Sequence, residues 1–257
     1  MATEAGAHKA AEAANGLGVD PMHQFVIQPI VPIRIGSLDL SFTNSTLWMF
    51  ITVGVIAAFL LLGGTRLVPS RWQAMKEASY EFIADLVRDI LGDEGRPFFP
   101  FVFALFMFIL TANMLGMVPY SFTVTSHIIV TFALALFVFV LATVVGFVKH
   151  GVRYLRLFVP SGVPPLMLVL LVPIEIISYF TRPISLSVRL FANMMAGHAM
   201  LKVFGGFVVA LGILGGWLPL AVMVGVTALE VLVAFLQAFV FVMLTVIYFN
   251  DALHLDH

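Results

Sequence analysis

Long apolar runs separated by short charged stretches organise this chain. The first run, 40–65, contains no charged residue and exceeds the ~20 residues that a helix needs to cross the ~30 Å hydrocarbon core of a bilayer. A second run, 98–148, has no Asp, Glu, Lys or Arg and carries turn-forming residues at 119–126. This pattern predicts one span followed by a hairpin of two spans, at about 98–118 and 128–148.

Two further apolar runs, 161–205 and 217–250, are separated by the glycine-containing turn Gly212–Gly216. Pro173 and Pro183 lie inside the first of them, and kinks are expected there because proline removes a backbone hydrogen bond. The chain is therefore predicted to be an all-α polytopic membrane protein that ends in a hairpin of two long helices.

The segment 70–91 has a different pattern. Ser70 with Gln73 fits a capping box, and Gly92 fits a C-terminal cap. Apolar residues recur at helical spacing on one face, and the other face is charged: Lys76, Glu77, Glu81, Asp85, Arg88 and Asp89. We interpret this segment as an amphipathic helix on the cytoplasmic membrane surface, with a solvated linker helix as the alternative.

The chain divides into three parts by pattern. Residues 1–39 form a polar N-terminal tail and extended segment, 40–250 form a single integral membrane domain, and 251–257 form a short polar C-terminal tail. Within 25–43, apolar and polar residues alternate around prolines, which indicates short extended or irregular structure. No apolar h-region of a cleavable signal peptide is visible in 1–20.

Lysine and arginine positions predict the orientation in the membrane. Arg66, Arg71 and Lys76 follow the first span, and Lys149 and Arg153 follow the third, whereas the turn between the second and third spans has neither residue type. By the positive-inside rule the N-terminus is periplasmic and the C-terminus cytoplasmic. We expect a multi-pass protein of a bacterial inner membrane.

Composition supports the membrane assignment. The 257 residues are 61% hydrophobic and 11% charged, with a mean hydropathy of +1.07, whereas soluble domains carry about 25% charged residues. There is no cysteine, which excludes disulfides, thiol catalysis and cysteine-ligated metals; no metal or cofactor is expected. The net charge of -1 does not indicate a nucleic-acid partner. Without a G-x-x-x-x-G-K-[ST] loop, any ATP chemistry would belong to another subunit.

Polar residues inside the last two runs are the candidate functional site. An ionised Arg at bilayer depth costs ~2.5–3.5 kcal/mol on insertion scales, so a chain that keeps one there is expected to use it. The candidates are Glu175, Arg189, Asn193, His198, Glu230 and Gln237.

A straight helix predicts how these residues face one another. Antiparallel folding about residues 213–214 pairs Arg189 with Gln237 and His198 with Glu230. His198, however, lies roughly 180° from Arg189 around the helix. Either the helix bends, or the two faces serve two different water pathways, which we prefer. Residues within about 40° of Arg189 form a polar, small-residue stripe: Glu175, Ser178, Arg182, Ser185, Asn193 and Ala196.

Three other polar residues have structural interpretations beside functional ones. Asn113 suits helix packing better than the ion path. Arg182 fits local pairing and function equally well, and His127 fits an interfacial position at the outer turn.

Three segments resemble subunit a of the F-type ATP synthase, the A chain of its membrane sector. They are RPISLSVRLFANMMAGH (Arg182–His198), LEVLVAFLQAFVFVMLTVIY (Leu229–Tyr248) and PFFPFVFALFMFILTANMLGMVPY (Pro97–Tyr120). The resemblance covers most of 40–250. It implies one N-terminal transmembrane helix, an amphipathic surface helix, a transmembrane hairpin, and two long tilted helices.

The resemblance also implies a stator charge. In that family the arginine that matches Arg189 faces the rotating ring of c subunits, and Asn193 and Gln237 match its polar neighbours. The expected role is proton translocation through two aqueous half-channels, without catalysis by this chain. The implied partners are the c-ring, the peripheral stalk b subunits and membrane lipid.

The same resemblance implies a proton path. Glu175 matches an acidic residue of the outer half-channel. His198 and Glu230 match a pair that some members carry in the opposite order, acid first. All three are candidates for the path from the outer side.

Two other function classes remain open from the residues. One is a secondary transporter with its own substrate site, in which Glu175 and Arg189 bind a zwitterion. The other is a structural scaffold that anchors a peripheral stalk.

Overall fold

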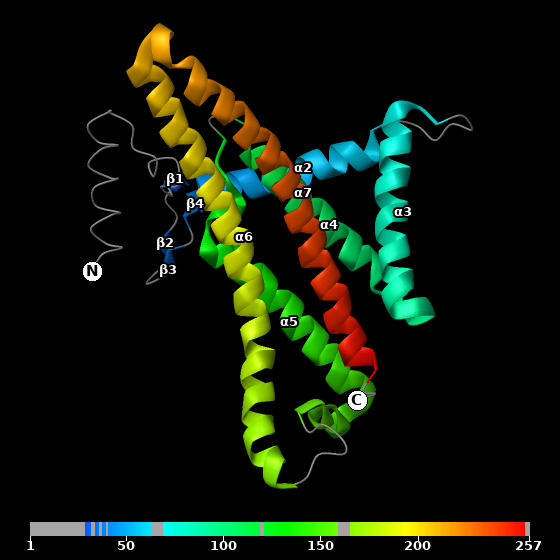
Figure 1. Cartoon of the computed structure of the whole chain (residues 1–257). Helices are drawn as coiled ribbons and strands as arrows, with labels where there is room; N and C mark the ends of the chain where they lie inside the picture. Colours follow the sequence, from blue (N-terminus) through cyan, green and yellow to red (C-terminus); the bar gives the residue numbers. More distant parts are fainter. Residues whose placement is uncertain are drawn as a thin grey trace.

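The computed structural model describes residues 29–31, 34–35, 38–39, 41–62, 69–118, 121–158 and 165–254. Within these ranges helices dominate, and a few short strands lie near the N-terminus (Figure 1).

Five helices in the described part of the chain are long and apolar enough to cross a membrane. They are α2 (Asn44–Leu61), α4 (Phe99–Gly116), α5 (Ile128–His150), α6 (Pro165–Gly215) and α7 (Trp217–Leu253). The predicted all-α polytopic fold is confirmed, and so are the two turns that divide the later spans. A marked difference in bounds is that the helical geometry of α6 continues past the predicted end at 205 to Gly212, where the glycine turn begins.

The extended structure expected over 25–43 is confirmed where that segment is described. β1 (Pro29–Val31) pairs antiparallel with β4 (Phe42–Thr43), and β2 (Arg34–Ile35) pairs with β3 (Leu38–Asp39). The Thr43 side chain then accepts the N–H of Thr46 and caps α2. The tail predicted at 1–24 lies outside the described residues.

The capped amphipathic helix is α3 (Arg71–Leu91). The Ser70 hydroxyl accepts the Gln73 N–H, and Gly92 ends the helix at φ 61°, a conformation that glycine adopts without steric cost. The short helix η2 (Gly92–Gly95) follows.

One face of α3 packs against α4 and α7, and its buried residues are Ile83, Val87 and Leu91. Lys76 of α3 also reaches back to α2, where its ammonium group donates to the carbonyl oxygens of Leu60 and Leu62. These carbonyls lie at the end of α2, so Lys76 supplies donors that the end of a helix lacks. The interpretation of α3 as a free solvated linker is therefore wrong.

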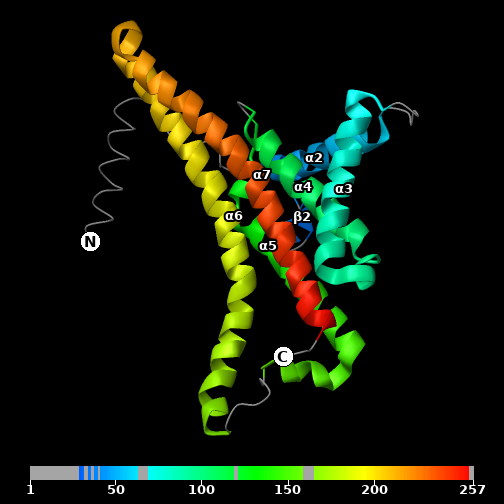
Figure 2. The same ribbon diagram turned by 45° about the vertical axis from the view of Figure 1, so that its right-hand side comes forward.

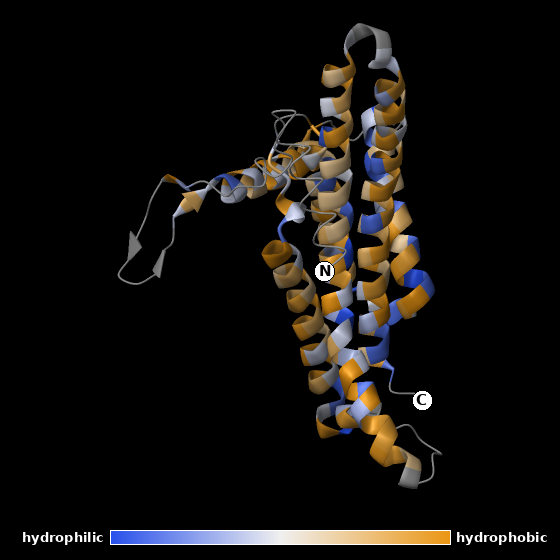
Figure 3. Ribbon diagram, turned by 60° about the vertical axis from the view of Figure 1, so that its left-hand side comes forward, coloured by the Kyte–Doolittle hydropathy of each residue, from blue (hydrophilic) through white to orange (hydrophobic). Residues whose placement is uncertain are grey.

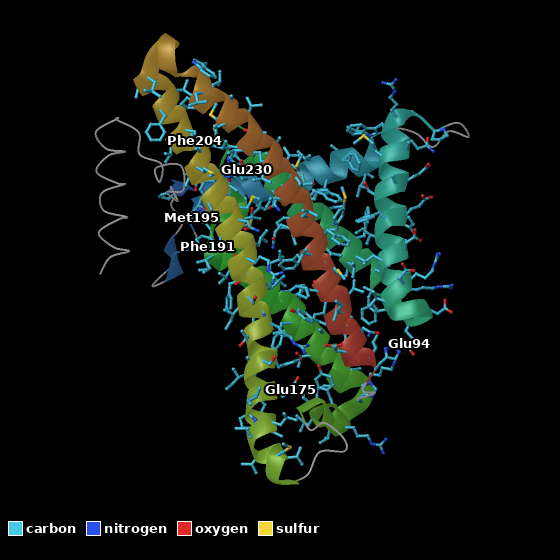
Figure 4. The ribbon with its side chains drawn as sticks, in the orientation of Figure 1. Glu94, Glu175, Phe191, Met195, Phe204 and Glu230 are labelled. Carbon is cyan, nitrogen blue, oxygen red and sulfur yellow. The ribbon has the colours of Figure 1, made fainter. Side chains whose placement is uncertain are left out.

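An ion pair fixes the region after α3. Glu94 of η2, labelled in Figure 4, pairs with Lys149 in the last turn of α5. The Lys149 ammonium group holds the pKa of the Glu94 carboxyl below its ordinary value. Since both side chains are partly exposed, this pair links the ends of two elements without contributing much to stability.

α6 and α7 form the long terminal hairpin (Figures 1 and 2). Gly212 adopts φ 60° and breaks the helical geometry at the turn. Pro173 and Pro183 lie inside α6, which remains helical through both. The ribbon changes direction between the labelled Glu175 and Phe191 (Figure 4), an interval that contains Pro183.

The lengths of α6 and α7 constrain how they lie in a bilayer. At 1.5 Å per residue, the 46 residues from Met167 to Gly212 in α6 and the 37 of α7 correspond to ~69 Å and ~55 Å of helix, against a ~30 Å hydrocarbon core. α2 is much shorter and runs crosswise to this hairpin (Figures 1 and 3). If α2 crosses the bilayer along the membrane normal, α6 and α7 fit within the same bilayer only when they are strongly tilted.

The core lies where α4 and α5 pack on the hairpin. Phe106 and Ile109 of α4, Val138 of α5 and Phe241 of α7 are fully or almost fully buried. Ala234 and Ala238, both buried, let neighbouring helices approach α7 closely. Hydrophilic positions interrupt the otherwise hydrophobic ribbons of the hairpin (Figure 3).

Substituting Gly146 should test the packing of η4 (Gly151–Phe158) onto α5. A Cβ at Gly146 would lie 2.3 Å from the buried ring of Tyr154, whose hydroxyl is held 3.0 Å from that of Tyr179. We expect Gly146→Ala to lower the free energy of unfolding by about 1–3 kcal/mol because the core is overpacked. The thermal unfolding midpoint in detergent measures this.

The matched control for that substitution is Gly54→Ala in α2, where an added Cβ meets nothing within 4 Å. Both changes raise helix propensity equally. Equal midpoints for the two variants would contradict the described packing.

Candidate functional site

His198 of α6 and Glu230 of α7 meet inside the protein. His198 Nδ1 lies 2.8 Å from Glu230 Oε1, and the two residues are 8% and 4% exposed. The pairing of these two residues expected from the turn position is confirmed. Neither Glu230 oxygen has a well-aligned hydrogen bond to the described residues, so the contact is an ion pair by distance.

The second nitrogen of His198 determines what this pair can do. Nε2 lies 2.7 Å from the Gly116 carbonyl oxygen and 3.1 Å from the Thr123 hydroxyl. A carbonyl only accepts, so Nε2 carries a hydrogen and donates it to Gly116. Nδ1 lies 2.9 Å from the Met194 carbonyl oxygen as well as 2.8 Å from Glu230 Oε1. A hydrogen on Nδ1 is therefore donated to Met194, and the Glu230 carboxyl group lies beside that bond, close enough to exchange a proton with the ring after a small reorientation of the side chains.

A glycine provides the room for the Glu230 carboxyl group. A Cβ at Gly197 would lie 2.7 Å from Oε1 and 3.0 Å from Cδ of Glu230. Any larger residue at this position would displace the carboxyl group from His198. The close approach explains why a glycine precedes the histidine of the pair in the sequence.

Hydroxyl groups surround the pair on the side of α4. They belong to the turn that contains η3 (Val124–Ser126), where Thr123 contacts His198 and Thr125 donates to Asn113 at 2.9 Å. Asn113 is fully buried and donates to the Ala234 carbonyl oxygen of α7 at 3.2 Å. This geometry is that of helix packing, as expected for Asn113. Sequence reasoning missed the turn hydroxyls as neighbours of the pair, although their density at 121–126 was a signal.

His127, next to this turn, is half-buried and stacks on the Phe122 ring at 4.9 Å between centroids. Burial lowers the pKa of the His127 imidazole, which favours its neutral form.

A second polar contact lies one to two helical turns from the first. Asn193 donates to the side-chain oxygen of Gln237 at 2.9 Å, and Gln237 is buried. The sequence pattern predicts Arg189 as the partner of Gln237, and that pairing is wrong by about one turn of α6. Arg189 is exposed, and it makes no hydrogen bond or ion pair with any residue that the structure describes.

Arg189 and His198 lie on different faces of α6. His198 points to α4 and the η3 turn, while Arg189 remains exposed. This is the arrangement expected for residues ~180° apart on a helix. Both faces of α6 therefore carry polar residues. Of the two, only the face with His198 is covered by other described parts of this chain.

Glu175 lies apart from the other candidates. It is half-buried near the start of α6, while Glu230 lies in the other half of the hairpin (Figure 4). The 23 positions between Glu175 and His198 correspond to ~35 Å along a helix. The structure therefore brings His198 and Glu230 together but does not bring Glu175 to them.

Arg182 has a partner that the sequence pattern does not indicate. It donates to Asp251 Oδ2 at 2.9 Å. α7 continues to Leu253, so Asp251 belongs to the last turn of the helix although its polar surroundings suggest the C-terminal tail. Arg182 therefore forms an ion pair within this chain, which is the structural interpretation given to it above.

A disulfide can test the contact of α6 with α7 at this site, since the chain has no native cysteine. A Cβ at Gly197 lies 3.3 Å from Cγ of Glu230. That Cγ approximates where the sulfur of a cysteine at position 230 would lie, so the geometry suits a bridge. We expect the double variant Gly197→Cys, Glu230→Cys to cross-link under mild oxidant, as measured by loss of maleimide labelling that a reductant restores.

The control is Gly205→Cys with Glu230→Cys, because position 205 lies ~12 Å further along α6 and faces open space. Cross-linking of the control rather than the test pair would contradict the register.

The sequence matches known proteins along most of its length. The family described as ATP synthase A chain matches residues 46–250. ATP synthase subunit a of Mesorhizobium japonicum is 61% identical over 247 residues, covering 93% of this chain and 98% of that protein. The Parvibaculum lavamentivorans protein of the same name is 58% identical over 96% of this chain and 98% of its own length. The Pelagibacter ubique one is 57% identical over 94% of this chain and its entire length. Together with the five apolar helices and the polar hairpin, these matches show that the chain belongs to the ATP synthase A chain family.

Proposed function

We propose that this chain is the proton-translocating stator subunit of the ATP synthase membrane sector, with Arg189 as the fixed charge that faces the c-ring. The proposal rests on the environment of the Arg189 side chain. It is a permanent cation on an apolar helix, exposed and unpaired among the described residues. A charge in this setting needs a partner of opposite sign, and this chain does not supply it within its described part.

A carboxylate on a moving neighbour is the partner that fits. A carboxyl group that travels through lipid is neutral, because burial disfavours the charged form. At ~4 Å and an effective dielectric of ~20, the guanidinium group of Arg189 favours the ionised form by about 4 kcal/mol. That is enough to release the proton into an aqueous path, and a membrane potential of ~100 mV adds ~2.3 kcal/mol per charge to set the direction.

Two paths are supported by the placement of the polar groups. The pair His198 and Glu230, with the hydroxyls around η3, suits a proton path because histidine can take up and release a proton near neutral pH. We assign this pair to the outer path. The family resemblance implies Glu175 for the same path. We propose it instead for the inner path, since Glu175 lies in the half of α6 away from Glu230 (Figure 4) and α6 contacts η4, which directly follows the basic end of α5.

Arg189 lies between these two regions along α6. It is ~21 Å from Glu175 and ~14 Å from His198. Because Arg does not release its proton, it blocks direct transfer from one path to the other. Protons then cross only on the moving carboxylate, which couples their flow to rotation.

The remaining assignments follow from this role. The chain performs no catalysis by itself, and its partners are the c-ring, the peripheral stalk b subunits and lipid. The curated relatives come from bacteria, which supports a bacterial inner membrane. The basic residues after α2 and α5 support a periplasmic N-terminus and a cytoplasmic C-terminus.

The transporter alternative loses the substrate site suggested for it. Glu175 and Arg189 are ~21 Å apart along a continuous helix, too far to hold the two ends of one small zwitterion. The scaffold alternative leaves the buried His198–Glu230 pair without a role.

The first test replaces the fixed charge. We expect Arg189→Ala to reduce proton-driven ATP synthesis by roughly 10²-fold or more, because about 4 kcal/mol of attraction is lost, and to allow passive proton leak. Synthesis and leak are measured in membrane vesicles that contain the whole complex. Ser185→Ala on the same face is the control, and it should keep near-normal rates. Coupled synthesis at the control rate in Arg189→Ala would refute the role.

The second test removes the titratable proton from the buried pair. Glu230→Gln keeps the shape of the side chain but cannot relay a proton, so we expect about tenfold or greater loss of proton flux with normal assembly. The control is Glu81→Gln, the same change on the exposed face of α3. If flux in vesicles is the same in both variants, Glu230 is not on the path.

A further inference from the structure

A second arginine lies on the same face of α6 as Arg189. Arg182 precedes it by seven positions, which corresponds to ~20° around the helix and ~10.5 Å along it. Both are permanent cations. A carboxylate that moves along this face would therefore meet two guanidinium groups unless one of them is neutralised.

Arg182 is neutralised within this chain. Its guanidinium group donates to Asp251 Oδ2 at 2.9 Å, and the two side chains are 28% and 24% exposed. Arg189, by contrast, has no such partner in the described part of the chain. The two arginines thus differ in available charge although they share a helix and a face.

Aromatic rings hold Arg182 in this position. Its Cζ lies 5.6 Å from the ring centroids of Tyr179 and of Tyr248, a distance at which a cation is attracted to an aromatic face. The Tyr179 hydroxyl lies 2.7 Å from that of Thr143 and 3.0 Å from that of Tyr154. A side chain fixed in this way stays turned towards Asp251 rather than swinging out to the open face.

We propose that Asp251 masks the charge of Arg182, so that α6 presents a single stator charge, Arg189, to the passing carboxylate. This inference rests on the proposed function of Arg189. An unmasked Arg182 would be a second resting point for the carboxylate, ~10.5 Å from the first. The c-ring would then pause with its carboxylate beside Arg182, at a position that is not served by a proton path. Coupled turnover would slow down as a result.

The test compares three variants of the whole complex in membrane vesicles: Asp251→Asn, Arg182→Gln, and both together. Asp251→Asn keeps an oxygen acceptor and nearly the same shape, but it exposes the charge of Arg182. We expect it to slow ATP-driven proton pumping and proton-driven synthesis about tenfold, the effect of ~1.4 kcal/mol of added attraction at the wrong position. The double variant should recover to within about twofold of the unchanged complex, since it has no second charge to mask.

The recovery separates masking from a structural clamp. If the pair only holds α7 to α6, the double variant is as impaired as Asp251→Asn, or more so, and the proposal is overturned. The amount of this subunit per complex is measured in each membrane. If neither Asp251→Asn nor the double variant assembles, the pair is structural and the proposal also fails. Asp251→Glu keeps the charge and should remain active.

The proposed function is tested separately by Arg189→Ala. If that variant is inactive while Asp251→Asn has unchanged rates, Arg189 keeps its role and masking alone is wrong. If Arg189→Ala keeps coupled synthesis, the proposed function fails and masking fails with it.

Discussion

Charge inside apolar helices is the constraint on which this structure depends. Each charged or strongly polar group in the α6–α7 hairpin costs free energy in lipid unless it finds a partner. His198 pairs with Glu230, Arg182 with Asp251 and Asn193 with Gln237. All three contacts join α6 to α7, so the groups that would otherwise oppose membrane insertion fix the register of the hairpin. Arg189 is the arginine of α6 left without a partner among the described residues, and this contrast makes it the functional candidate.

The sequence predicts much of the fold because lipid restricts the choices. Backbone in a bilayer must satisfy its own hydrogen bonds, so long apolar runs become helices, and their ends fall where turn residues and charges begin. The contact of His198 with Glu230 agrees with the position of the glycine turn. The caps of α3 follow from Ser70 and Gly92 for a similarly local reason.

What the sequence does not predict depends on distances within one helical turn. Gln237 pairs with Asn193 rather than Arg189, because pairing by residue number assumes straight helices and ignores the length of each side chain. Asp251 is polar and near the end, which suggests a tail, yet α7 continues past it. The hydroxyls of Thr123 and Thr125 reach His198 and Asn113 only through the irregular turn at η3, which no periodicity describes.

The geometry of the buried pair also explains how the reversed order of acid and histidine can retain the chemistry. α6 and α7 are antiparallel neighbours, and the 2.8 Å separation of Nδ1 and Oε1 does not depend on which helix carries which group. What fixes the pair in place is the surrounding shape: Gly197 leaves room for the carboxyl group, and the Gly116 carbonyl orients the ring. In this chain the room is on α6, opposite a carboxyl group on α7. If the two residues were exchanged, the histidine would lie on α7 and the acid on α6. The small residue that makes room for the carboxyl group would then have to lie on α7, beside the histidine.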